Sequence, residues 1–321
     1  MTKDSAPNNS PPQPESAGVL TPPVNHDSIF IGPNGIRAGW RLLIFLFLAA
    51  GIGVCIVGVC LALIPPARNF LLALQTKGPI TPGALFAGEG GGCAVVLIAA
   101  ALMTRIEKRS FSDYGLPLNQ AFGKLFWLGS LTGFVALTAL IGLIAARHGY
   151  STGGLAVTSH DAVKYGLLYA IAFLLVGLFE EFTFRGYLQY TLASGIGFWA
   201  AAIILAILFG ASHLSNPGEA KFGALMAGGF GLVAVFSLRR TGNLWFAIAM
   251  HAAWDWGETF FYSVPDSGLL ARGHLLNASF HGPNWLTGGS VGPEGSIFVF
   301  PVLVFWGLAI HFMFPARRSV S

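Results

Sequence analysis

The chain has 321 residues, of which 54% are hydrophobic and only 10% charged, and its formal net charge is +4. Soluble domains carry about 25% charged residues, and the mean hydropathy of +0.66 lies far above their range. This composition excludes a soluble globular enzyme, a nucleic-acid-binding protein and a disordered scaffold. At about 20 apolar residues for each membrane-crossing helix, half of the chain could lie in lipid.

Residues 1–29 differ in composition from the rest of the chain. Six of the 18 prolines fall there, among Asn, Ser and Gln residues. Such a segment buries too little apolar surface to offset its loss of conformational entropy, so we predict a disordered, Pro-rich tail. The first apolar run begins only at Trp40, and no pattern of a cleavable signal peptide precedes it. We expect residues 30–321 to form one membrane-embedded domain.

Eight apolar runs follow the tail and predict an all-α bundle of about eight transmembrane helices. In chain order they are Trp40–Ile64, Pro82–Met103, Phe122–Ala146, Val163–Phe184, Phe198–His213, Phe222–Leu238, Asn243–Tyr262 and Ile297–Phe314. Lys and Arg are enriched on the cytoplasmic side of membrane proteins. With the N-terminus inside, the inner segments hold twelve of these residues and the outer segments six. We therefore expect a multi-pass protein of a plasma or inner membrane with both termini cytoplasmic.

The segment Ser263–Ser296 is the long connection that follows the seventh run. Its Gly and Pro content argues against a regular helix. Long loops in compact proteins are often functional, and this one is expected to form a lid or plug over the bundle.

Charged residues within membrane helices are costly and indicate function, and here they cluster in three late runs. The candidates are Glu180, Glu181 and Arg185 in the fourth run, Phe209 and His213 in the fifth, and His251 and Asp255 in the seventh. Taken singly, each group has an ordinary interpretation: a solvated helix end, an interfacial histidine, a packing phenylalanine or a structural pair. Their combination and order make a shared polar centre the stronger hypothesis.

The spacing of these residues predicts how they pair. Glu181 precedes Arg185 by four positions, the favourable orientation for an intrahelical ion pair. Glu180 is rotated by about 100° around the same helix, so its carboxylate is left to face a neighbouring helix. His251 and Asp255 are also four apart and share one face of their helix.

Two further acidic residues have no assigned partner. Glu258 follows His251 by seven positions and extends the same stripe. Glu89, in the second run beside three glycines, either lines the bundle or marks a helix break.

The three groups resemble the motifs of the CAAX protease and bacteriocin-processing family, which are EExxxR, FxxxH and HxxxN or HxxxD. In this chain they read Glu180-Glu181-Arg185, Phe209-His213 and His251-Asp255 within a core of residues 163–262. The family consists of membrane-embedded endopeptidases and includes the type 2 CAAX prenyl proteases. The prenyl proteases carry Asn where this chain has Asp255, so the role of that residue is less defined.

Two chemical routes to peptide hydrolysis suit these residues. In the first, His213, His251 and either Glu180 or Asp255 bind zinc and lower the pKa of a bound water. In the second, which is free of metal, Glu180 takes a proton from a water that His213 also holds. His251 and Asp255 then stabilise the oxyanion. The resemblance to the prenyl proteases favours the second route, and neither HExxH nor its inverse occurs in the chain.

The sequence thus predicts an intramembrane endopeptidase that acts on a protein or peptide at the lipid bilayer. Glu181, Arg185 and Phe209 would support the catalytic residues, and zinc is left open as a cofactor. A proton-coupled transporter is the first alternative, because intramembrane Glu, His and Asp also form proton relays. The second alternative is a non-catalytic membrane scaffold of the same fold.

Overall fold

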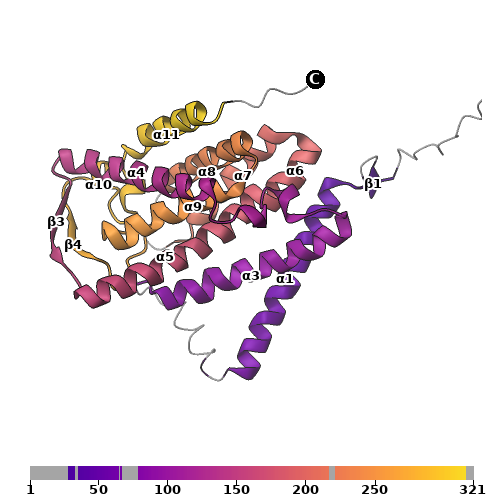
Figure 1. Ribbon diagram of the computed structural model, residues 1–321, viewed down its shortest axis with the longest axis horizontal. Helices are drawn as coiled ribbons and strands as arrows, with labels where there is room; N and C mark the ends of the chain where they lie inside the picture. The colour runs from indigo at the N-terminus through magenta and orange to yellow at the C-terminus, as the bar shows by residue number, and fades with distance from the viewer. Residues whose placement is uncertain (1–27, 33–34, 65, 67–78, 217–220, 316–321) are drawn as a thin grey trace, which may run out of the picture.

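The computed structural model describes residues 28–32, 35–64, 66, 79–216 and 221–315, so that most of the predicted tail lies outside the described residues. The chain forms a helical bundle (Figure 1). Its α-helices are α1 (Ala38–Leu63), α3 (Pro82–Glu107), α4 (Lys124–Ala146), α5 (Ser159–Glu181), α6 (Gln189–Ile196), α7 (Phe198–His213), α8 (Lys221–Thr241), α9 (Leu244–Trp256), α10 (Asn284–Thr287) and α11 (Val299–Met313). Two π-helices, η3 (Phe182–Leu188) and η4 (Gly257–Phe261), continue α5 and α9, and 3-10 turns form η1 (Phe111–Tyr114), η2 (Leu118–Gln120) and η5 (Pro293–Gly295).

Each of the eight predicted runs coincides with a helix of the described chain. Five helical stretches are long and apolar enough to cross a membrane, namely α1, α3, α4, α8 and the continuous helix from Ser159 to Ile196. Helices α7 and α11 are apolar but shorter. Large apolar side chains on α1 and α11 face outward, as for Phe47 at 77% and Phe312 at 78% exposure. The all-α membrane bundle is therefore confirmed, whereas the number of crossings stays a prediction.

Side-chain caps fix where three of the functional helices begin. The Thr81 hydroxyl accepts the Ala84 N–H at the start of α3, and Thr158 accepts the Asp161 N–H at the start of α5. Asn243 accepts the Trp245 N–H at the start of α9. Each cap satisfies a backbone donor that the first helical turn leaves without a partner.

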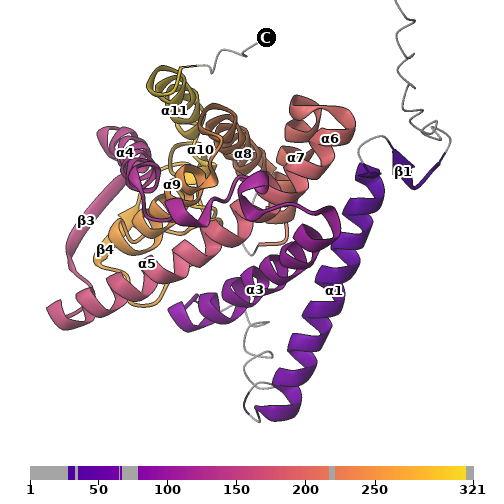
Figure 2. The same cartoon turned by 45° about the vertical axis from the view of Figure 1, so that its right-hand side comes forward.

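Helix α9 lies at the centre of the bundle, where α4, α5 and α8 surround it (Figure 2). All residues from Leu244 to His251 are buried. Glycines allow the neighbouring helices to approach closely, because a Cβ atom at Gly177 of α5 would lie 2.6 Å from the Ile248 carbonyl oxygen. Small residues at such crossings are typical of helix packing in membranes.

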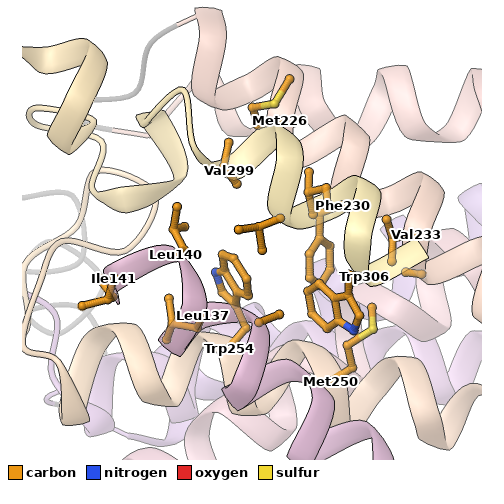
Figure 3. Packing of buried hydrophobic residues seen from close by; sticks show 14 of the residues in the cluster. Leu137, Leu140, Ile141, Met226, Phe230, Val233, Met250, Trp254, Val299 and Trp306 are labelled. Atoms are coloured by element: carbon orange, nitrogen blue, oxygen red, sulfur yellow. The ribbon is translucent and has the colours of Figure 1, made fainter. Parts of the chain in front are cut away.

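An aromatic cluster forms the apolar wall of this centre (Figure 3). The rings of Trp254 and Trp306 stack at 5.6 Å, and Phe230 of α8 lies edge-on to Trp306 at 5.8 Å. Phe230 also contacts the His251 ring, with their centroids 4.8 Å apart. The packed core therefore ends directly at one of the predicted site residues.

The segment Ser263–Ser296 is folded, and it carries β4 (Leu276–Phe280), α10 and η5. Strand β4 pairs antiparallel with β3 (Tyr150–Leu155), with Tyr150 opposite Phe280. A second small pair joins β1 (Ile31–Gly32) and β2 (Gly35–Ile36). The prediction of all-α structure did not include these strands. Only Tyr150 of β3 is buried, so the strand lacks the apolar alternation that makes a strand visible in sequence.

Candidate active site

The end of α5 carries the first motif, and the helix changes its pitch there. Glu181 is the last residue of α5, and Arg185 lies in the π-helix η3 that follows. Arg185 Nη1 donates to Glu181 Oε1 at 3.1 Å, and both side chains are almost completely buried. The predicted pair is therefore present. Single-turn π segments within α-helices are frequent at functional sites.

Glu181 has a second partner that the helical spacing did not predict. His251 Nδ1 lies 2.8 Å from the same Glu181 oxygen that accepts from Arg185. Because an ionised carboxylate can only accept, Nδ1 is the protonated ring nitrogen in this contact. Glu181 thus connects α5 to α9 and fixes the orientation of the His251 ring.

The other ring nitrogen of His251 faces two more carboxylates. Nε2 lies 3.6 Å from Glu180 Oε2 and 3.5 Å from Asp255 Oδ2. The buried Glu180 Oε2 has no hydrogen-bond partner among the described residues. Glu180 and Glu181 therefore point to different atoms of one histidine, as their 100° offset on the helix requires.

The second motif places an aromatic ring against this charged network. The Phe209 ring lies 4.0 Å from the centre of the Arg185 guanidinium, a cation–π contact, and 4.7 Å from the His213 ring. His213 Nδ1 lies 2.8 Å from the Phe209 carbonyl oxygen of its own helix. This contact makes Nδ1 the donor, so that the neutral ring carries its lone pair on Nε2, which can accept.

The three motifs open into one cavity of about 140 Å³. Its polar lining comes from α3, α5, α7, α9 and the segment after α9. These residues are Glu89, Glu180, His213, Asn216, His251, Asp255, Asp266, Ser267 and Glu294. At about 30 Å³ for each water, such a cavity holds a few water molecules.

Several members of this lining lay outside the three motifs. Glu89 lies within the unbroken helix α3 and lines the cavity, which confirms the first of its two interpretations. Asp266, Ser267 and Glu294 come from the segment expected to form a lid, and they face the same space as Glu180. The motif spacing could not reveal them, because their place depends on the path of the loop.

A further acidic group lies beside this cavity. Within the described part of the chain, Glu258, Asp266 and Glu294 bring three carboxylates together, with ligating oxygens all within 4.8 Å of one another. Burial, and then the Glu294 carboxylate, raise the pKa of Asp266 to about 8. The set predicted for zinc, Glu180, His213, His251 and Asp255, does not form such a mutual group in the described residues.

Residues 162–257 match the family model described as type II CAAX prenyl endopeptidase Rce1-like. The match begins one residue before the predicted core of residues 163–262, ends at Gly257 and contains all three motifs. No curated protein and no solved structure matches the chain significantly. Over these helices, the resemblance to the CAAX protease and bacteriocin-processing family is thereby confirmed.

Proposed function

We propose that the chain is an intramembrane endopeptidase that hydrolyses a peptide bond of a membrane-associated protein or peptide. The observation that carries this proposal is the convergence of three motifs from α5, α7 and α9 on one polar cavity. Histidines and carboxylates that face one cavity are groups that can activate a water molecule and stabilise the charge that develops on the substrate.

In this proposal Glu180 is the general base. Its Oε2 atom is buried and has no hydrogen-bond partner among the described residues, so it is available to a water in the cavity. The Nε2 atom of His213, whose Nδ1 donates to Phe209, accepts a hydrogen bond from the same water and orients the water's lone pair toward the substrate carbonyl. Proton transfer to Glu180 then produces the nucleophile.

His251 and Asp255 stabilise the negative charge that develops on the substrate carbonyl oxygen. With Nδ1 held by Glu181, the ring can present an Nε2–H toward the cavity, where it donates to the developing oxyanion. Asp255 lies beside Nε2 and favours its protonated form by direct attraction. Glu181 and Arg185 are positioning residues, because they hold the His251 ring and do not face the cavity.

The metal-free route remains our preference over zinc. The four predicted ligands do not form a mutual ligand group within the described chain. Their sequence spacing differs from that of soluble zinc proteases and resembles that of the prenyl proteases. Both histidines do hold their rings through Nδ1, an arrangement that also suits metal ligands, so a direct metal test is included below.

Access to the cavity depends on the segment after α9. The enclosed part of this space, about 140 Å³, is sufficient for water and small compared with a peptide segment. Because Asp266, Ser267 and Glu294 form part of its wall, we expect this segment to move when substrate enters. With both termini cytoplasmic, the segment would lie on the outer side of the membrane.

The test is a cleavage assay with the purified full-length protein in detergent. Peptides that end in a prenylated cysteine motif, and matched unmodified peptides, are incubated with the protein and analysed by mass spectrometry. The wild type should cleave at a defined bond, and Glu180→Gln should lose activity by about 10²- to 10⁴-fold. Asp161→Asn, at the exposed start of the same helix, is the matched control and should cleave normally.

Each alternative has its own outcome. Cleavage that is equal in wild type and Glu180→Gln would show contamination or a different base. A proton flux into liposomes that depends on Glu180, without cleavage of any peptide, would favour the transporter. A folded protein without either activity would be a scaffold.

A further inference from the structure

The end of α9 carries a second group of carboxylates, distinct from the motif residues. We define the cap carboxylates as Glu258, Asp266 and Glu294, which come from η4, from the turn after it and from η5. Their ligating oxygens lie within 4.8 Å of one another. Three negative charges at this separation repel one another strongly unless protons or a cation are shared between them.

Glu258 provides the second, independent observation. Its side chain is 0% exposed, and neither carboxylate oxygen has a hydrogen-bond partner among the described residues. The described chain also shows no ion pair between Glu258 and Lys, Arg or His. The indole N–H of Trp254 interacts with the Glu258 carboxylate, although not in hydrogen-bonding geometry. A buried carboxylate that only a neutral indole approaches is expected to hold a proton or a cation.

Hydrogen bonds from neighbouring residues orient the two other cap carboxylates, as is usual for metal ligands. Thr259 donates its hydroxyl to Asp266 Oδ2 at 2.8 Å. Ser267 donates both its hydroxyl, at 2.6 Å, and its backbone N–H, at 3.1 Å, to Glu294 Oε2. These hydrogen bonds hold one oxygen of each carboxylate in place.

The backbone also closes tightly around this group. Gly292 has φ +107°, and a Cβ atom there would collide with the Pro265 carbonyl oxygen and lie 3.1 Å from Glu258 Oε1. Only glycine fits this position without strain. The approach brings the chain that carries Glu294 against the end of α9.

The donor chemistry selects the ligand. The group offers carboxylate oxygens and no nitrogen or sulfur, a set that suits hard cations such as Ca²⁺, Mg²⁺ or Mn²⁺ rather than Zn²⁺. Ca²⁺ binds oxygen at about 2.4 Å, so two oxygens on opposite sides of the ion are about 4.8 Å apart. It also tolerates ligands that come from irregular loops.

We propose that the cap carboxylates bind one divalent cation of the Ca²⁺ type, which ties the segment after α9 to the end of that helix. The cation is separate from the proposed water-activating residues, and this inference does not rest on the proposed function. Because Asp266 and Glu294 also line the catalytic cavity, the ion would hold part of the cavity wall in place.

The test measures cation binding to the full-length protein in detergent after treatment with a chelator. Titration calorimetry with CaCl₂ should give one saturable site in the wild type, and Ca²⁺ should raise the thermal unfolding temperature by several degrees, since a ligand of the native state stabilises it. Glu258→Gln should weaken binding at least tenfold and abolish the shift. Asp161→Asn, an exposed carboxylate, should bind as the wild type does.

The folding of each variant can be checked in the same experiment. Without Ca²⁺, Glu258→Gln should unfold at a temperature no lower than the wild type, because the change removes an unpaired buried charge. Should that variant fail to fold, Glu294→Gln, whose amide oxygen can still accept from Ser267, takes its place. A wild type with no saturable site for Ca²⁺, Mg²⁺ or Mn²⁺, or binding unchanged in the folded variant, would overturn the proposal. Cation binding lost in His213→Ala but kept in Glu258→Gln would also overturn it, since the ion would then lie in the catalytic cavity.

Discussion

Helix α9 presents buried carboxylate networks at two levels, and the two are built differently. One turn before its end, His251 lies among Glu180, Glu181 and Asp255, and Arg185 completes the network. At its end, Glu258 meets two more acids and no cationic side chain in the described chain. Both levels border a π-helical segment.

The difference shows how a membrane-embedded protein can bury acidic groups in two ways. Charges that pair within the chain are tolerated because each compensates the other. Charges without a partner in the chain require a proton or an external ion. The first network therefore contains cationic side chains of the protein, although Glu180 Oε2, Glu181 Oε2 and Arg185 Nη2 have no hydrogen-bond partner among the described residues. The second network has no cationic side chain in the described chain.

The largest effect is expected from breaking the paired network. Arg185→Ala removes the permanent cation beside Glu181 and leaves His251 as its remaining partner, and it should lower stability by about 3–5 kcal/mol. Glu180→Ala should cost less, because Glu180 Oε2 has no hydrogen-bond partner among the described residues and lies 3.6 Å from His251 Nε2. Thermal unfolding in detergent measures both. Equal losses, or a larger loss for Glu180→Ala, would contradict the assignment of Glu181 as the partner of Arg185.

The next effect separates the proposed base, Glu180, from the proposed oxyanion donor, His251. His251→Ala should reduce the cleavage rate by about 10²- to 10³-fold, the usual cost of removing one donor, and should leave measurable activity. Glu180→Gln should leave less, because it keeps the shape and loses the base. Single-turnover cleavage rates compare the two, with Asp161→Asn as the control. A His251→Ala variant that is less active than Glu180→Gln would contradict the assigned roles.

A smaller effect is expected from the glycine that makes room for the guanidinium. A Cβ atom at Gly231 of α8 would collide with Arg185 Nη2. Gly231→Ala should therefore displace Arg185 and destabilise the protein by about 1–3 kcal/mol, as overpacking usually does.

Gly307→Ala on α11 is the matched control, because a Cβ there would meet no atom within 4 Å. The unfolding temperatures of both variants are compared in one detergent. Equal stabilities would show that Arg185 is free to move away.

Replacing a buried glutamate with glutamine should change the stability of the protein in opposite directions in the two networks. Glu181→Gln weakens contacts to Arg185 and His251 and should destabilise the protein by about 1–3 kcal/mol. Glu258→Gln, measured without divalent cations, should be neutral or stabilising. Both changes replace a buried glutamate with its neutral isostere, so the pair is internally matched. A loss of stability in both variants would mean that Glu258 has a partner within the protein.

Sequence patterns predicted what lies within one helix and missed what joins separate segments. The pair of Glu181 and Arg185 follows from a spacing of four, and the eight helices follow from apolar runs. The contact of Glu181 with His251 spans 70 positions, and no local rule could predict it. Likewise Glu258 was placed on the His251 stripe, but its acidic neighbours come from a loop. Loop paths depend on turn geometry, such as the positive φ of Gly292, rather than on periodicity.

The smallest expected effect shows whether a metal ion binds at the His251 network or at the cap carboxylates. If the proposed active-site cavity works without metal, a transition-metal chelator such as 1,10-phenanthroline should change the cleavage rate by less than about twofold, since no step depends on a bound zinc. A Ca²⁺-selective chelator should instead lower the unfolding temperature of the wild type and leave that of Glu258→Gln unchanged. Cleavage rate and unfolding temperature are recorded on the same preparation. Activity that is lost with 1,10-phenanthroline, restored by Zn²⁺, and accompanied by zinc that disappears in His251→Ala would move the ion to the motif residues, and Glu180 would then act on a metal-bound water.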